Sequence, residues 1–154
     1  MAVQNQYKEN DYTVVVAALN LAEYVIHITD NLNKFPDYST KEIIEENGLT
    51  TKILVQRQDS LVNWVRDQVK QIYLLTYTAN EINVKKYPWL KDERFSKQET
   101  AINICNEHLA AIQLCKKHFH LDSSKVKYWG SITVNLKQLI EKWNKNDKRR
   151  YKDI

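Results

Sequence analysis

The sequence is poor in glycine and proline, with only two of each in 154 residues. Sheets and tight turns use both residues heavily, so their scarcity favours long helices. With glycine only at 48 and 130, a Walker phosphate loop, a dinucleotide fingerprint and a serine nucleophile elbow are all excluded. The length suits one domain with a hydrophobic core. We therefore expect a single all-α domain over residues 1–154.

Long apolar runs and disulfide-spaced cysteines are also missing. The sequence has no run of about 18 apolar residues, so it predicts no membrane span. The segment MAVQNQYKENDY lacks the charged-then-apolar pattern of a signal peptide. Cys105 and Cys115 lie in one predicted helix, about 15 Å apart at about 1.5 Å per residue, which is too far for a disulfide. Two free, buried thiols suit a reducing compartment. We expect a cytoplasmic protein that does not contact a membrane.

What the sequence does contain is a set of apolar stripes spaced by three or four residues, the spacing of one buried helix face. We expect helices over about residues 12–35, 50–84, 97–119 and 125–146, and a basic C-terminal tail over 147–154. The first stripe consists of Val14, Ala18, Leu21, Val25, Ile28, Leu32 and Phe35. The last consists of Val126, Trp129, Ile132, Leu136, Leu139 and Trp143. Such stripes predict an up-down antiparallel four-helix bundle.

Local signals suggest where these helices begin and end. Pro36 should stop the first helix, because the residue before a proline disfavours helical geometry. The segment YPWLKDERF reads as a loop, and Ser96–Glu99 forms a capping-box signature that should open the third helix. One of residues 122–124 (Asp-Ser-Ser) should cap the fourth helix.

Residues 37–60 are harder to assign and look like an insertion between the first two helices. KEIIEEN could form a short helix closed by Gly48, a natural left-handed cap. Thr50 or Thr51 would then begin the second helix, whose apolar face continues to about residue 84.

The candidates for catalysis or metal binding are weak. Side chains that bind metals occur at Cys105, His108, Cys115, His118 and His120, but no CxxC or HExxH spacing is present. Acidic pairs fall in predicted connections, where they read as solvated surface rather than as acid–base catalysts. We therefore expect structural roles for these residues, no metal, no cofactor and no enzymatic activity.

Positive charge is concentrated near the C-terminus. Residues 116–154 hold 11 Lys and Arg against 4 Asp and Glu, whereas residues 1–115 hold 12 against 15. A basic segment on a nearly neutral body favours a polyanion or an acidic protein surface as partner, and a merely solubilising tail is the alternative. Trp143, beside Lys142 and Lys145, is the one candidate for stacking on a base, although core packing is the default interpretation.

Four segments, in order over most of residues 15–151, resemble a known family. They are AALNLAEYVIHITDNLNKFP, VRDQVKQIYLLTYTANEI, KQETAINICNEHLAAIQLCKKHFHL and KYWGSITVNLKQLIEKWNKNDKRRY. The groupings ITD…KFP, ANEI and YW…W…D-K-x-R-Y carry the likeness together. The chain resembles the accessory variability determinants of diversity-generating retroelements, four-helix-bundle proteins related to those encoded by intervening sequences in bacterial 23S ribosomal RNA genes. The insertion-like segment 37–60 departs from that pattern.

The resemblance implies a non-enzymatic homopentamer that binds the retroelement's reverse transcriptase and its template RNA or RNA/DNA during mutagenic copying. A bundle protein of the ribosomal intervening-sequence type, with other partners, is the alternative. Charge and helix placement then select the contact candidates, since no base-reading signature is present. The candidates are Lys137, Lys142, Lys145, Lys148, Arg149 and Arg150, with Arg66 and Lys70 as secondary ones.

Overall fold

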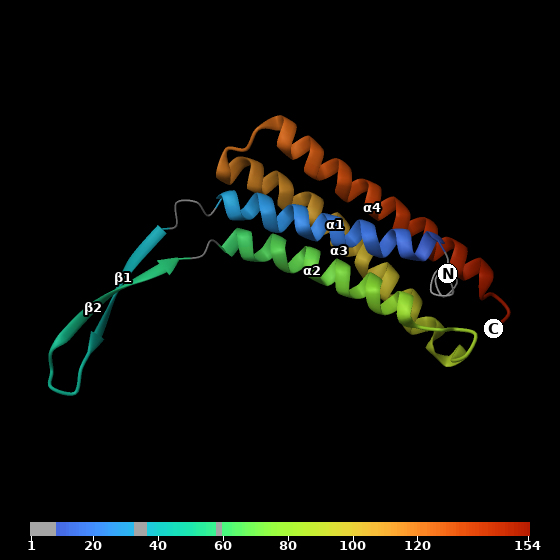
Figure 1. Ribbon diagram of the computed structural model, residues 1–154, viewed down its shortest axis with the longest axis horizontal. Helices are drawn as coiled ribbons and strands as arrows, with labels where there is room; N and C mark the ends of the chain where they lie inside the picture. Colours follow the sequence, from blue (N-terminus) through green and yellow to red (C-terminus); the bar gives the residue numbers. More distant parts are fainter. Residues whose placement is uncertain (1–8, 33–36, 58–59) are drawn as a thin grey trace, which may run out of the picture.

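The computed structural model describes residues 9–32, 37–57 and 60–154. Its elements are α1 (Glu9–Leu32), β1 (Asp37–Ile44), β2 (Thr50–Arg57), α2 (Ser60–Glu81), the 3-10 helix η2 (Pro88–Leu90), α3 (Lys91–Phe119) and α4 (Ser123–Arg150). Figure 1 shows the four α-helices side by side, each running opposite to the next. Each packs on its neighbour in the chain, and α4 packs back on α1. The predicted antiparallel four-helix bundle is confirmed.

The core lies between the four helices and is built from the predicted stripes. Leu21 and Val25 of α1 and Trp129 and Trp143 of α4 are almost completely buried. Leu32, Ile132 and Leu139 lie at the edges of their stripes and are partly exposed. Each helix contributes one apolar face, as expected for helices that pack nearly antiparallel around one core.

One helix, α1, is long and apolar enough to cross a membrane by length and composition alone. The qualifying stretch is Tyr12–Asp30, with a mean hydropathy of 1.4. The core helix of a bundle meets the same criterion, and α1 places Val14, Ala18 and Leu21 in the core. This finding is therefore weak evidence for a span.

The expected helix at residues 37–60 is wrong, because β1 and β2 form an antiparallel hairpin there. The amide of Gly48 donates to the Glu45 carbonyl at 2.9 Å, and Gly48 takes a φ of +80°. That left-handed conformation was expected, but it closes a hairpin turn instead of a helix. Asn-Gly between segments rich in Thr, Ile and Val is a hairpin signal, and it prevails over the helical interpretation. The hairpin projects from one end of the bundle (Figure 1).

Other helix boundaries differ from prediction, and the first helix begins at Glu9, not at about residue 12. The second helix begins at Ser60, not at residue 50, and ends at Glu81. The third begins at Lys91, so the predicted capping box at Ser96 lies inside the helix. Pro88 explains this early start, because proline fits the first turn of a helix and η2 leads directly into α3. Residues 33–36, including the predicted stop at Pro36, lie outside the described residues.

The C-terminal end differs as well, because residues 147–150 of the predicted tail are the last turn of α4. Asp147 is completely buried and Tyr151 nearly so, which keeps this turn on the bundle. At the other end of α4, Asp122 occupies the N-cap position as predicted, but its side chain makes no capping hydrogen bond.

Candidate nucleic-acid interface

The basic end of α4 is held in place by a buried ion pair. Arg94 of α3 donates from Nε to Asp147 Oδ2 at 2.7 Å, and both side chains are almost fully buried. The Nη1 of Arg94 also donates to the carbonyls of Ala79 and Ile82, each at 3.1 Å. One guanidinium therefore joins the ends of α2 and α4 to the start of α3.

A second layer of contacts surrounds this pair. Gln98 Nε2 donates to Asp147 Oδ2 at 2.6 Å, and Asn144 Nδ2 donates to Gln98 Oε1 at 2.7 Å. The Arg94 guanidinium also lies 5.2 Å from the ring centre of Trp143, within cation–π range. Burying these charges is tolerable because they are paired and hydrogen-bonded. The last turns of α4 are consequently a rigid support for the cations on their outer side.

Three of the predicted cations form one outward stripe on that support. Lys142, Lys145 and Arg149 follow one another by three and four residues, so they share one helix face. All three side chains are exposed, and none has an ion-pair partner within the described part of the chain. This group, the α4 stripe, therefore keeps its full positive charge.

The other contact candidates on α4, Lys148, Lys137 and Arg150, are paired with carboxylates, whereas Lys125 and Lys127 at the start of the helix are exposed. Lys148 Nζ lies 2.6 Å from Glu99 Oε1, and Lys137 Nζ lies 3.9 Å from Glu141 Oε1. Arg150 is largely buried, and its Nη2 lies 3.5 Å from the second oxygen of Asp147. These charges are partly neutralised, and Arg150 belongs to the buried network rather than to an open surface.

The two secondary candidates lie elsewhere on the bundle. Both belong to α2, which packs on α1 and α3, whereas α4 packs on α3 and α1, so α2 and α4 occupy opposite corners. Arg66 donates from Nε to Thr29 Oγ1 at 2.7 Å and pairs with Asp30, which joins α2 to the end of α1. Lys70 is exposed. The structure does not bring Arg66 and Lys70 together with the α4 stripe.

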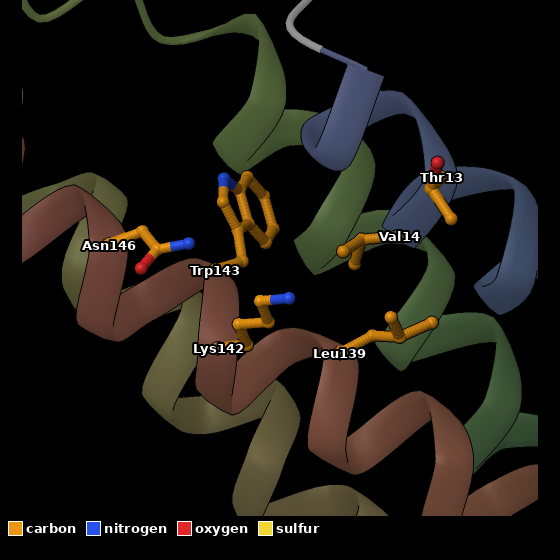
Figure 2. Close-up of a pocket in the computed structure, with 6 residues that line it drawn as sticks. All are labelled: Thr13, Val14, Leu139, Lys142, Trp143 and Asn146. Atoms are coloured by element: carbon orange, nitrogen blue, oxygen red, sulfur yellow. The ribbon is translucent and has the colours of Figure 1, made fainter.

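A small cavity lies between α1 and α4 beside the stripe (Figure 2). Its volume is about 40 Å³, and its lining includes Val14, Lys142 and Trp143. A cavity of this size accommodates water rather than a nucleotide base. Trp143 is 1% exposed, which confirms the default interpretation of core packing and excludes the alternative of base stacking. Its Nε1 has no hydrogen-bond acceptor among the described residues.

The candidate metal ligands take structural positions. Trp129 Nε1 donates to His108 Nε2 at 2.9 Å, so the proton of His108 resides on Nδ1, which donates to Gln68 Oε1 at 2.8 Å. Burial lowers the pKa of His108 to about 4. Burial also raises the pKa of the Cys105 thiol to about 12. In the described residues, no cluster of three His, Cys, Asp or Glu side chains is arranged to hold a metal ion.

The remaining candidates, Cys115, His118 and His120, are structural too. Cys115 is a buried thiol that forms no disulfide, as predicted for both cysteines. His120 ends α3 in the left-handed conformation, with its backbone amide donating to the Lys116 carbonyl. His118 packs edge to face on Phe119, with ring centres 4.7 Å apart.

The structure contains an exposed aromatic pair that was not identified from the sequence. Tyr87 and Trp89 lie in the α2–α3 connection, with ring centres 5.4 Å apart, and Lys85, Lys86 and Lys91 are next to them in sequence. The interleaving of cations and aromatic residues is a signal of such a pair in the sequence, which the loop prediction does not use.

No family model matches the chain, and neither a curated protein nor a solved structure matches it. Function is therefore inferred from the residues and from the geometry of the bundle.

Proposed function

We propose that this chain is a non-enzymatic accessory protein of a diversity-generating retroelement. It binds the reverse transcriptase and the template RNA in the cytoplasm and supports mutagenic cDNA synthesis. The observation that carries this proposal is the α4 stripe, in which Lys142, Lys145 and Arg149 are exposed and unpaired within the described residues. Cations held on an ordered helix suit a ligand that carries regularly spaced negative charge.

The dimensions of the stripe favour a phosphate backbone. Its three cations span about 10 Å along the helix axis, at about 1.5 Å per residue. Contacts of this kind provide affinity without sequence choice, through the release of counterions from the nucleic acid. The polymerase would supply the chemistry and the choice of template, and this chain would hold the RNA beside it.

The outer face of α1 supports self-association, which the proposal also includes. Tyr12, Val16, Leu19 and Ile26 are exposed there, separated by four, three and seven residues. Tyr12, Val16 and Leu19 adjoin one another on a surface that no other described helix covers, and Ile26 follows beyond the exposed Glu23. Exposed apolar patches commonly mark sites of protein association. We assign this face to contacts between copies in a homo-oligomer, for which the resemblance implies five subunits.

The experiment is co-purification with the reverse transcriptase encoded beside this gene, with and without nuclease treatment. The proposal predicts a complex of chain, polymerase and RNA. Absence of such a gene, or a polymerase that never retains the chain even at low salt, would contradict it. RNA binding without any polymerase binding would favour a protein of the ribosomal intervening-sequence type.

A further inference from the structure

We infer that Trp89, supported by Tyr87, is a stacking site for the bases of single-stranded nucleic acid. The inference rests on the proposed RNA binding and adds a base-contacting residue to a surface otherwise defined by charge. The site lies in the α2–α3 connection, outside every contact residue that the sequence analysis selected.

The exposure of Trp89 is the first observation. Its side chain is 74% exposed, whereas Trp129 and Trp143 are buried and Trp64 is 44% exposed. Exposure of so large an apolar ring to water is unfavourable, and the exposed ring contributes little to the stability of the fold. A ligand that covers the ring would recover that free energy.

The rigidity of the connection is the second observation. Asn83 accepts a hydrogen bond from the Lys86 amide at its side-chain oxygen (3.1 Å) and another from the Tyr87 amide at its carbonyl (2.9 Å). The Leu90 amide donates to the Tyr87 carbonyl at 3.0 Å, closing the 3-10 turn that carries Trp89. A ring on such a turn loses little conformational freedom when a base stacks on it.

Tyr87 orients the indole. The two rings meet edge to face, with an interplanar angle of 72°. Lys86 Nζ lies 5.3 Å from the centre of the Tyr87 ring, a cation–π arrangement that places a positive charge beside the aromatic pair. Exposed aromatic rings beside cations are the usual components of sites that bind single strands, where the rings stack on bases and the cations contact phosphates.

The α4 stripe and Trp89 lie at the same end of the bundle. Lys91 Nζ donates to the Ile154 carbonyl at 2.6 Å, which joins the start of α3 to the chain after α4. Figure 1 shows the α2–α3 connection near the C-terminus. Exposed cations lie at both places, Lys85 and Lys86 beside Trp89 and the three cations of the α4 stripe. A single strand that runs along this end of the bundle would contact both.

The test compares Trp89→Ala with Trp64→Ala, because Trp64 is an exposed tryptophan at the opposite end of α2. The probe is a ten-nucleotide oligoadenylate, titrated at three salt concentrations. Trp89→Ala should weaken binding by about 5- to 150-fold, the range for loss of one stacked base, with an unchanged salt slope. Trp89→Phe should restore part of the affinity, and Trp64→Ala should bind like the natural protein.

Inorganic polyphosphate is the second probe, because it has phosphates but no bases. Trp89→Ala should bind it as tightly as the natural protein does. Normal oligoadenylate binding by Trp89→Ala, or an equal loss in Trp64→Ala, would overturn the stacking site while leaving the proposed function intact. A natural protein that binds no oligoadenylate at any salt concentration would overturn both.

Discussion

His108 is a core residue whose protonation should destabilise the fold. It accepts a hydrogen bond from Trp129 and donates one to Gln68, so it joins α2, α3 and α4 in its neutral form. Protonation would place an N–H on Nε2, opposite the N–H of Trp129, and would charge a site that is fully buried. Burial therefore holds the pKa of His108 at about 4, below its ordinary value of 6.5.

This lowered pKa predicts a loss of stability in mild acid. Between pH 6.5 and 4 the unfolded chain binds a proton at His108 and the folded chain does not, so the free energy of unfolding falls as the pH falls. The loss should be on the order of 3 kcal/mol by pH 4. Urea unfolding at pH 7.5, 6, 5 and 4 measures it, and His108→Gln should lack this share of the pH dependence. Equal slopes in the two proteins would contradict the prediction.

Two ion pairs that join α3 to α4 should differ greatly in their contribution to stability. Asp147→Ala removes the buried carboxylate that accepts hydrogen bonds from Arg94 and Gln98, and it should lower the free energy of unfolding by about 3–5 kcal/mol. Glu99→Ala removes only the exposed pair with Lys148 and should cost less than about 1 kcal/mol. Urea denaturation of both variants checks this, and similar losses would contradict the assignment of Arg94 and Asp147 as the fixed support of the α4 stripe.

At the scale of the element, the buried faces could be predicted and several ends could not. Apolar residues at helical spacing identified the four helices, because a helix in a bundle has to bury one face. The end of α4 was missed because Asp147 is a polar residue that is buried only by pairing with Arg94, which is 53 positions earlier in the sequence. Such a long-range pair leaves no local pattern.

The candidate site was predicted only in part for a similar reason. Charge identified the cations of α4, and three of them form the exposed stripe. Sequence could not show that Lys148 and Arg150 have carboxylate partners, or that Arg66 lies at an opposite corner of the bundle. Helical spacing placed Trp143 on the buried stripe, but sequence could not show how far Trp89 is exposed, because that depends on tertiary packing.

The hairpin should contribute little to the stability of the bundle. Its strands pair with each other and project from the bundle end, and an isolated two-stranded hairpin is marginally stable. Replacing residues 37–57 with a short Gly-Ser linker should shift the melting temperature by no more than about 2–4 °C, equivalent to about 1 kcal/mol. Calorimetry of the two proteins measures the shift, and a much larger one would show that the hairpin stabilises the helices.

At the scale of the whole molecule, the apolar face of α1 should hold copies together. Val16→Glu places a charge in that face and should shift the oligomer toward monomer without unfolding the bundle. Val134→Glu is a matched control on α4, since both valines are 36% exposed. Light scattering after size exclusion gives the mass of each, and circular dichroism verifies folding. A natural protein that is monomeric at micromolar concentration, or equal dissociation by both variants, would contradict this interface.

The central claim is that the α4 stripe binds RNA, and a titration of RNA affinity against salt concentration tests it most directly. The stripe variant is the triple substitution Lys142→Ala, Lys145→Ala, Arg149→Ala. The control is a second triple variant, Lys116→Ala, Lys117→Ala, Lys125→Ala. The control removes the same charge from exposed positions at the far end of α3 and the start of α4. Three lost phosphate contacts should reduce the slope of log affinity against log salt by about 2. We predict that reduction for the stripe variant alone. Equal effects of the two variants, or no salt-sensitive binding by the natural protein, would contradict the account.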